Sequence, residues 1–380
     1  MSTARGLGIV GWGAAGRLMA AAAERTGRFR LSGVADISED ARAHAAREAG
    51  CSVWASVDEL AGARDVDVIY VASPTVHHRA AVETAAAHGK HVISEKPLAV
   101  TLEEAQRVVE AAQRAGVVLL VGATHSSDAP VRALRRLVEE VRLGALLSVA
   151  SACHTDWHRR PRSAADLDAG QGNGLVLRQG AHQFDILRYV CGGVAQRVFA
   201  MTFGGSAGRE RGFSACISFG NGAQASAYYS GTGGFDSRLL TWGVGELATV
   251  DIDPGPPLGR YFALPGREAV TQVSPMFGTT VATFSEGTVW LTPRGLLIHE
   301  ETGVREQSVA GQLSGWDAVL DEMDSALEGR QPVHDGAWGV ATLETCLAVH
   351  ESARTGAPVS LEHQVALPTA SHFTALKEIS

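Results

Sequence analysis

Residues 7–122 alternate short apolar runs with helical segments, and this alternation limits the possible folds more than any other feature of the sequence. The run Val66–Ala72 is continuous and rich in β-branched residues, which is typical of a strand buried on both faces. Strands separated by helices predict a doubly wound parallel sheet of six strands, five of which we can assign to residue ranges. The other strand ranges we identify are 7–10, 29–35, 91–94 and 117–122, and the main helices cover 14–25, 39–48, 78–88 and 101–115.

The pattern changes after residue 123, where regular alternation of strands and helices stops. We expect a helix over 130–143, a strand over Leu146–His154, a long loop over Trp157–Gly174 and a helix over Gln179–Tyr189. From residue 197 to about 297, short alternating runs such as Leu239–Val244 are separated by turn signals such as Asn221-Gly222. These features predict an α+β segment with a mainly antiparallel sheet.

Length and the change of pattern together predict two domains. The chain has 380 residues, more than the roughly 250–300 at which single cores tend to divide. We expect a first domain over 1–124 and a second over 125–380. Further helices are predicted at 316–327 and 335–355, and the last of these is expected to pack back on the first domain.

The turn after the first strand has the spacing of a dinucleotide-binding motif. Asp36 ends the second strand, 20 residues after the last glycine of that turn. The glycines would let the backbone approach a pyrophosphate at a helix N-terminus, and Asp36 would bind the ribose and repel a 2′-phosphate. This predicts NAD in preference to NADP; the alternative is a glycine-rich turn with an unrelated aspartate. The motif comprises Gly11, Trp12, Gly13, Ala14, Ala15 and Gly16.

Lysine is rare in this chain, so each lysine is a candidate for a specific task. Of 33 basic residues only Lys90, Lys96 and Lys377 are lysine, and lysine can lose its proton whereas arginine effectively cannot. Lys96 follows Glu95 directly after a strand, at the edge of the sheet where such folds bind ligands. It could hydrogen-bond a substrate hydroxyl or relay a proton; the alternative is an ion pair with Glu95.

A third segment, Arg178–Asp185, carries a histidine. His182 and Asp185 are three residues apart and would share one helix face. Histidine is the usual general base near neutral pH, and a carboxylate could fix its tautomer. The alternative is a buried structural histidine.

These three segments, in this order, resemble the Gfo/Idh/MocA oxidoreductases over nearly the whole chain. The resemblance implies an N-terminal Rossmann domain and a C-terminal domain with a large open sheet, which meets the nicotinamide and often forms the dimer contact. It implies that Lys96 and His182 are the catalytic pair. Further residues implied to line the cofactor are Ser73, Pro74, Thr75, His78, Glu95 and Lys96.

Within this family, residues 125–132, 155–162 and 179–185 are similar to phthalate 4,5-cis-dihydrodiol dehydrogenases, which oxidise a ring cis-diol bearing two carboxylates. Two departures lie where substrate is expected: Arg178 stands where many family members have Asp, and Trp157-His158-Arg159 replaces a more apolar stretch. The substrate-binding residues that the resemblance implies are His125, Asp156, Trp157, Arg160, Arg162, Arg178, Gln179 and Asp185.

Arg178 has a physical consequence of its own. One helical turn before His182, its charge would disfavour the imidazolium and lower the pKa of that histidine. It could also bind a substrate carboxylate through two hydrogen bonds, as could Arg159, Arg160 and Arg162 from the loop. The alternatives are that Arg178 pairs with Asp185 or Asp156, and that the loop is a solvated basic segment.

The sequence therefore predicts an NAD-dependent enzyme that takes hydride from a secondary alcohol of a ring, most simply a carboxylated cis-dihydrodiol. His182 would accept the hydroxyl proton, and Lys96 would polarise the hydroxyl or relay the proton. The alternatives are a sugar or cyclitol dehydrogenase, including one that oxidises a sugar transiently with tightly bound NAD, and a non-catalytic dinucleotide-binding regulator.

Charge and composition limit the expected partners. A net charge of -8 disfavours nucleic acid, and no apolar run reaches the ~18–20 residues of a membrane helix. Residues 1–6 lack the apolar core of a secretory signal, and five scattered cysteines predict reduced thiols without a metal site. We expect a cytoplasmic homodimer or homotetramer, joined through the C-terminal sheet, that acts on a small anionic molecule.

Overall fold

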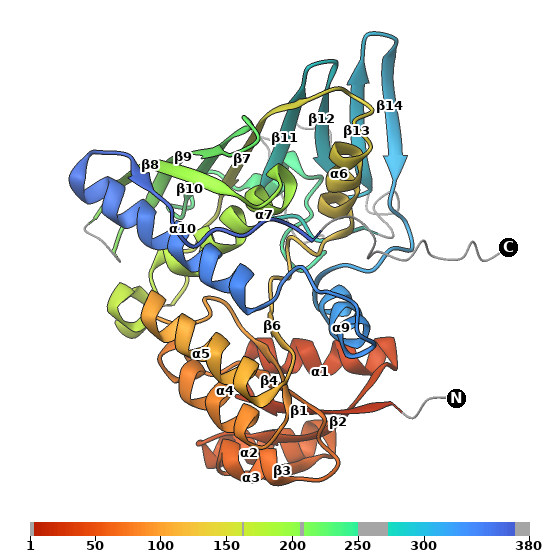
Figure 1. Ribbon diagram of the computed structural model, residues 1–380, viewed down its shortest axis with the longest axis vertical. Helices are drawn as coiled ribbons and strands as arrows, with labels where there is room; N and C mark the ends of the chain where they lie inside the picture. Colours follow the sequence, from red (N-terminus) through yellow and green to blue (C-terminus); the bar gives the residue numbers. More distant parts are fainter. Residues whose placement is uncertain (1–3, 162, 206–208, 250–272, 369–380) are drawn as a thin grey trace, which may run out of the picture.

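The computed structural model describes residues 4–161, 163–205, 209–249 and 273–368, and contains two β-sheets that lie one above the other in Figure 1. The first sheet has six strands in the order β3-β2-β1-β4-β5-β6, and every pair of neighbours is parallel. The doubly wound sheet predicted from the alternation is therefore confirmed. Its strands are β1 Arg5–Val10, β2 Phe29–Ala35, β3 Ser52–Trp54, β4 Val68–Val71, β5 His91–Ser94 and β6 Leu119–Val121.

Helices cover both faces of this parallel sheet. Helices α1 and α9 pack on one face, whereas α3, α4 and α5 pack on the other. The central strand β4 is buried along its full length, which explains its uninterrupted apolar sequence. The helices of this layer are α1 Ala14–Thr26, α2 Glu39–Ala49, α3 Val57–Gly62, α4 His78–Ala87, α5 Leu102–Ala115 and α9 Gly315–Leu327.

Helix α9 comes from the second half of the sequence but belongs to the first layer by packing. Its residues Val319, Leu320 and Met323 are buried in one cluster with Leu7 and Ile9 of β1. Figure 1 places α9 beside α1, next to the Rossmann sheet. The chain therefore returns to complete the first layer after it has built most of the second.

The second sheet has nine strands in the order β14-β13-β12-β11-β7-β10-β9-β8-β15. Its pairs are antiparallel except for β7 with β10, as expected for a mainly antiparallel sheet. The strands are β7 Leu146–His154, β8 Ala195–Phe203, β9 Gly212–Phe219, β10 Gln224–Ser230, β11 Thr279–Phe284, β12 Gly287–Thr292, β13 Gly295–Glu300, β14 Gly303–Ser308 and β15 Val359–Ser360.

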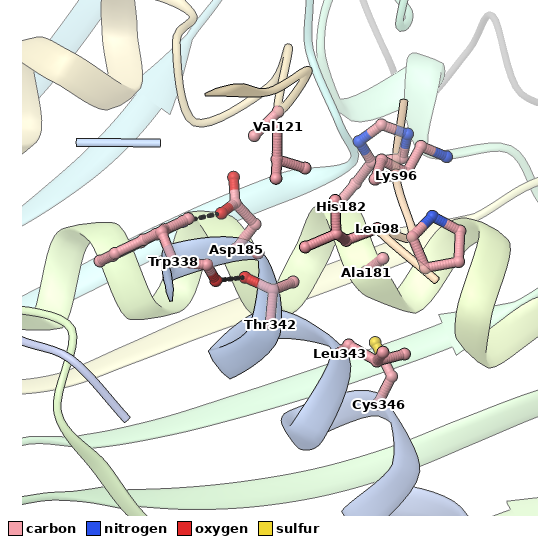
Figure 2. A pocket seen from close by; sticks show the side chains of 13 residues that line it. Lys96, Leu98, Val121, Ala181, His182, Asp185, Trp338, Thr342, Leu343 and Cys346 are labelled. Atoms are coloured by element: carbon pink, nitrogen blue, oxygen red, sulfur yellow. Dashed lines mark hydrogen bonds between the residues drawn. The ribbon is translucent and has the colours of Figure 1, made fainter. Parts of the chain in front are cut away.

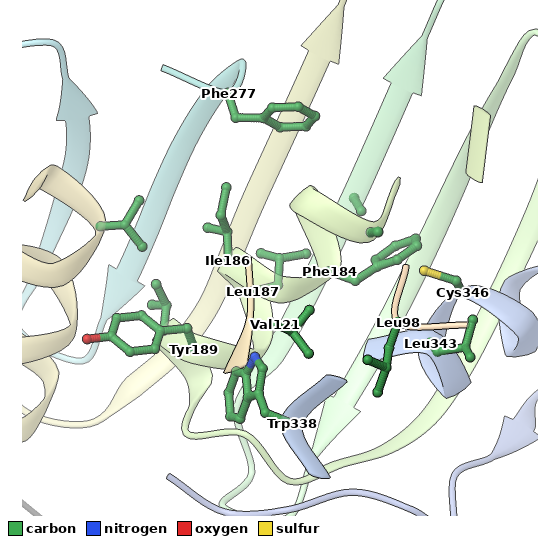
Figure 3. Packing of buried hydrophobic residues seen from close by; sticks show 14 of the residues in the cluster. Leu98, Val121, Phe184, Ile186, Leu187, Tyr189, Phe277, Trp338, Leu343 and Cys346 are labelled. Atoms are coloured by element: carbon green, nitrogen blue, oxygen red, sulfur yellow. The ribbon is translucent and has the colours of Figure 1, made fainter. Parts of the chain in front are cut away.

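One face of the nine-stranded sheet is covered by three helices, α6 Ala129–Glu139, α7 Ala181–Cys191 and α10 Gly336–Thr355. Figure 3 shows apolar side chains of α7 packed with Trp338 of α10 and with Leu98, which follows β5. Helix α10 also contacts α5 and β6, so it joins the two layers. On the uncovered face, Phe199, Met201 and Tyr228 are among the exposed large apolar side chains.

Three local predictions were wrong. The run Leu239–Val244 is not a strand; Asp236 accepts a hydrogen bond from the Arg238 amide and starts a 3-10 turn, Ser237–Leu240, instead. The helix expected to reach residue 143 ends at Glu139, because Val141 adopts a positive φ of 53°. The sixth strand of the first sheet, β3, lies at Ser52–Trp54, a segment to which we had assigned no strand.

In the part of the chain that the structure describes, no helix is both long enough and apolar enough to cross a membrane. The five cysteines form no disulfide.

Candidate active site

The turn after β1 has the geometry that a pyrophosphate requires. Gly11 has a φ of 96°, in the region that favours glycine, and a Cβ there would lie 2.9 Å from the Ala72 carbonyl oxygen. A Cβ on Gly16 would lie 2.2 Å from the Gly11 carbonyl oxygen, so only glycine permits this close approach of helix to strand. Gly13, in contrast, has open space around its missing Cβ. The backbone is thus exposed where the motif predicts phosphate.

The N-terminus of α1 lacks a side-chain cap and has no acidic residue in its first turn, so its amides and partial positive charge are available to an anion. Asp36 lies beside this turn, where one carboxylate oxygen accepts from the Trp12 amide at 2.9 Å and the other accepts from the Ser38 amide at 2.9 Å. Next to it Ile37 is 90% exposed and offers an uncovered apolar side chain. These residues fit the binding of a dinucleotide.

The segment after β4 adds a second wall. The hydroxyl oxygen of Ser73 is buried and has no hydrogen-bond partner among the described residues, so a polar ligand would satisfy it. Thr75 contacts Gly172 of the long loop, to whose carbonyl its hydroxyl donates at 3.4 Å. His78 is buried and bridges two strand ends, with ring nitrogens 2.8 Å from the Ser73 carbonyl and 3.0 Å from the Pro97 carbonyl. His78 therefore braces this wall rather than facing a ligand.

Lys96 lies at the carboxyl edge of the parallel sheet and reaches across to the second layer. Its Nζ donates to the Arg178 carbonyl oxygen at 2.7 Å. The Glu95 carboxylate accepts instead from the Tyr70 hydroxyl and from the Lys96 amide, so the described structure contains no Glu95–Lys96 ion pair. Burial and the charge of Arg178 lower the pKa of Lys96 to about 8, which makes a proton on Nζ exchangeable near neutral pH.

Lys90, in contrast, lies at the opposite edge of the sheet. Its Nζ donates to the carbonyl oxygens of Ala63 and Val66 and holds a loop.

His182 is the second residue of α7 and is buried beside Lys96. The turn that precedes α7, Val176–Gly180, is π-helical, a geometry that often marks functional sites. His182 has no hydrogen bond to the described residues, and its ring contacts the rings of His125 and Phe277, with centroids 4.7 and 5.2 Å away. Burial, followed by the charge of Lys96, holds the pKa of His182 well below its usual value. His182 is therefore a neutral imidazole at pH 7.

His125 is the second imidazole of the site. It precedes α6, and its Nδ1 lies 2.9 Å from the Asp128 carboxylate. The other Asp128 oxygen accepts from the Gly315 amide at 2.9 Å, and both side chains are buried. Burial lowers the pKa of His125, but the hydrogen bond and charge of Asp128 more than compensate, so the pKa lies above its usual value.

Asp185 does not orient His182. It accepts a hydrogen bond from the Trp338 indole, and the guanidinium of Arg188 stacks 3.9 Å from the centre of the Trp338 ring. Figure 2 shows Lys96 and His182 at one end of a small cavity and Asp185 with Trp338 at the other. The cavity has a volume of about 10 Å³, enough for about one water molecule.

Arg178 and Gln179 face the same region from the π-helical turn. The Arg178 guanidinium donates to the Asn173 amide oxygen at 3.1 Å, and no carboxylate of the described residues pairs with it. Its backbone carbonyl accepts from Nζ of Lys96, so Arg178 lies beside Lys96, and its charge lowers the pKa of both Lys96 and His182. The side-chain oxygen of Gln179 is buried without a hydrogen-bond partner within the described ranges. Both groups could bind a polar substrate.

Several side chains of the long loop have partners within the protein. Trp157 is buried in the core, Arg160 forms an ion pair with Asp156 at 2.7 Å, and Arg159 donates to the Thr232 carbonyl oxygen. Arg162 lies outside the described residues. Neither Asp156 nor Asp185 pairs with Arg178, contrary to one alternative.

Sequence reasoning missed three residues of this site. Asp128 repeats the His-x-x-Asp spacing that we noticed only at His182, so its signal was present in the sequence. Phe277 packs against both imidazoles, and the negative charge of Glu246 acts to raise the pKa of Lys96 and of His125. Nothing local in the sequence connects these two residues with the site, because they reach it from distant loops. The described residues contain no group of three or more metal-binding side chains.

Two family models match this chain. The model described as an oxidoreductase family with an NAD-binding Rossmann fold matches residues 5–123, and the GFO/IDH/MocA C-terminal domain matches residues 131–245.

Curated relatives and a solved structure match over most of the chain. A 1-carboxy-3-chloro-3,4-dihydroxycyclohexa-1,5-diene dehydrogenase of Comamonas testosteroni is 29% identical, covering 92% of this chain and 94% of the relative. A 1,5-anhydro-D-fructose reductase of Ensifer adhaerens is 30% identical, covering 81% and 83%. A solved structure from Bordetella bronchiseptica RB50, provisionally named a dehydrogenase, superposes with a TM-score of 0.86 at 32% identity, covering 94% of this chain and all of that one.

Proposed function

The chain belongs to the Gfo/Idh/MocA family of oxidoreductases with an NAD-binding Rossmann fold, and from that premise we propose that it oxidises a secondary alcohol on a carboxylated ring, most simply a cis-dihydrodiol. The observation that carries the proposal is Arg178, a guanidinium beside Lys96 and His182 that pairs with no carboxylate of the described residues. A partly buried cation of this kind matches a substrate carboxylate in charge and geometry. The name of the Comamonas testosteroni relative describes a carboxylated ring diol, in agreement with this substrate class.

The cofactor site suits NAD better than NADP. The turn 11–16 would hold the pyrophosphate, and Asp36 would bind the ribose and repel a 2′-phosphate. When bound, the dinucleotide supplies the hydride acceptor. We expect NAD to bind at least ~10-fold more tightly than NADP, about 1.4 kcal/mol, as measured by titration of the apo protein. Equal binding of the two would contradict this role of Asp36.

Lys96 and His182 would bracket the reacting hydroxyl. The Arg178 carbonyl fixes the position of Nζ of Lys96, and a pKa of about 8 lets Nζ donate a hydrogen bond and exchange its proton. Neutral His182 can donate a second hydrogen bond to the same oxygen. The apolar wall formed by Phe277 and the core of α7 excludes water from this side.

The experiment that tests this substrate class compares a carboxylated ring diol with its carboxamide. In Arg178→Gln we expect KM for the acid to rise at least ~10-fold while KM for the amide changes little, because one charge-assisted hydrogen bond is lost. The control is Arg354→Gln, since Arg354 is an exposed residue of α10 whose ion-pair partner among the described residues is Glu351. An equal loss on acid and amide would argue against a carboxylate bound by Arg178.

A second candidate function is oxidation of a sugar or cyclitol. The Ensifer adhaerens relative is named for an anhydro-sugar, and the carboxylate of Glu246 acts on Lys96 and could accept hydrogen bonds from several hydroxyls. This reading predicts equal effects of Arg178→Gln on charged and neutral substrates.

We also propose that a second copy of the chain covers the open face of the nine-stranded sheet. Phe199 and Met201 of β8 and Tyr228 of β10 expose apolar side chains on that face, with small residues such as Ser214 between them. Exposed apolar groups of this kind mark association surfaces. Met201→Glu should lower the oligomeric mass measured by light scattering, and an unchanged mass would argue against this face.

A further inference from the structure

The imidazole of His125 lies edge-on against that of His182, with ring centroids 4.7 Å apart and planes inclined by 71°. We propose that His125, oriented by Asp128, is the catalytic base that takes the proton from the substrate hydroxyl, while His182 stays neutral and positions the oxygen. This deepens the proposed function, on which it rests, and changes the role expected for His182.

Asp128 fixes the tautomer of His125. A carboxylate can only accept, so Nδ1 of His125 carries the hydrogen in the 2.9 Å contact with Asp128, and Nε2 is left as the acceptor. Asp128 is itself held by the Gly315 amide, and both side chains are buried, so the ring cannot easily turn. A base whose far nitrogen is held by a buried carboxylate is the arrangement that nucleophilic and general-base sites use repeatedly.

His182 lacks every feature that would let it keep a proton. The charges of Lys96, His125 and Arg178 all oppose a proton on it, and no described carboxylate accepts from it. Asp185, which shares its helix face, is engaged by the Trp338 indole. An imidazolium at this position would be surrounded by like charge in a buried environment, which is unfavourable.

The charges around His125 have the opposite balance. Asp128 on its own segment and Glu246 from the loop after the 3-10 turn favour its protonated form, whereas Lys96 at the end of β5 opposes it. The ring of His182 from α7 and the ring of Phe277 complete its surroundings. An added proton would therefore be more stable on His125 than on His182.

The proton balance is then complete. Oxidation of the carbinol to a carbonyl removes one hydride, taken by the nicotinamide, and one proton from the hydroxyl oxygen. That proton bonds to Nε2 of His125 and makes an imidazolium that Asp128 stabilises. In the reverse direction the same imidazolium returns the proton to the oxygen.

The first test uses the apo protein, so that it does not depend on turnover. Histidine Cε1–Hε1 signals are followed by NMR from about pH 4.5 to pH 9 in the wild type, His125→Gln, His182→Gln and Asp128→Asn. We expect the signal that is missing in His125→Gln to titrate above the ordinary histidine value, and to fall by at least about one pH unit in Asp128→Asn. The signal missing in His182→Gln should titrate below the ordinary value. The reverse assignment of the two histidines overturns the proposal.

The second test is kinetic. His125→Gln should lower kcat by roughly 100-fold or more, the scale of general-base assistance. Asp128→Asn should move the acid limb of kcat/KM, because the base it orients has changed its pKa. The control is Ser127→Ala, in the same turn, because the Ser127 hydroxyl donates to the Ala123 carbonyl oxygen and, among the described residues, to neither histidine.

Failure of the proposed function and failure of the role proposed for His125 give different results. If the wild type oxidises no carboxylated ring diol, the proposed function fails and the NMR result still decides the protonation of the dyad. If the diol is oxidised and His125→Gln retains the wild-type rate and pH profile, only the role of His125 is refuted. A folded state confirmed by thermal unfolding is required of each variant before either conclusion.

Discussion

Two segments of this chain carry a histidine followed three residues later by an aspartate, and the structure uses them differently. In His125–Asp128 the two side chains hydrogen-bond each other. In His182–Asp185 they do not, since Asp185 accepts from the Trp338 indole and His182 has no hydrogen bond to the described residues. The first pair is a charge-coupled unit at the site, whereas the second divides its members between the site and the core.

The difference arises from the backbone and from the neighbours. His125 lies in a turn in which the Asp128 amide donates to the His125 carbonyl oxygen, so the side chains converge before α6 begins. Asp185 lies inside α7, where α10 presents the Trp338 indole and where Arg188 follows within one turn. Identical spacing therefore says that two side chains can meet, and the surrounding groups decide whether they do.

The largest expected effect tests the structural half of this comparison. Asp185→Ala should lower the free energy of unfolding by about 3 kcal/mol, because it leaves the Trp338 indole without its acceptor and removes a negative charge that acts on the buried Arg188. Asp185→Asn should lose less, since it keeps an acceptor oxygen. Denaturant unfolding measures both. A stable Asp185→Ala protein with an altered pH profile would mean that Asp185 serves the site after all.

A slightly smaller effect is expected at Lys96, whose charge acts on both His125 and His182. Lys96→Ala should lower turnover by roughly 100-fold, about 2.7 kcal/mol, and His182→Ala should do the same, with dinucleotide affinity nearly unchanged. Lys90→Ala is the matched control, because Lys90 bonds only to loop carbonyls at the opposite edge of the sheet. Near-normal turnover of the Lys96 variant would remove Lys96 from the chemistry.

The smallest expected effect is the pH dependence of stability, which distinguishes the two histidines most directly. The pKa of His182 is lowered in the folded protein, so acidification favours the unfolded chain, and the stability it contributes is lost as the pH falls below about 6.5. The pKa of His125 is raised, so its contribution is full below about pH 6.5 and is lost as the pH rises through the folded value.

The two replacements should therefore have opposite pH dependence. Relative to the wild type, His125→Gln should lose more stability at pH 5.5 than at pH 7.5, and His182→Gln should lose less at pH 5.5 than at pH 7.5. Unfolding free energies at the two pH values give the comparison. A difference of the same sign in both variants would show that the two histidines have similar environments.

Most of the fold follows from the sequence because periodicity and turn residues act locally. The strands at 29–35, 91–94 and 146–154 lie where their apolar patterns place them. The segment Leu239–Val244 has the same kind of pattern, but the side chain of Asp236 caps a turn that the pattern does not reveal. The edge strand β14 is mostly exposed, and its placement depends on pairing with β13 rather than on composition.

In the site, too, some features follow from local sequence signals and others depend on tertiary contacts. The position of Lys96 after a strand and the spacing of Gly16 and Asp36 are local signals, and the structure places these residues at the predicted edge of the sheet. The partner of each histidine is a tertiary property. The sequence offered two equivalent aspartates and could not say that Trp338, 153 residues beyond Asp185, would engage one of them.

The packing of α9 on the parallel sheet limits how this protein can be recombined. A single crossover near residue 124 would exchange the substrate half together with Val319, Leu320 and Met323, which complete the apolar layer over β1. A chimera that keeps its parental dinucleotide unit therefore needs a second junction before Gly315, so that α9 is inherited with the sheet it covers. The exchanged segment then carries both His125 and Asp128, so this pair is exchanged together with the substrate half. The Gly315 amide, which hydrogen-bonds Asp128, lies at the second junction.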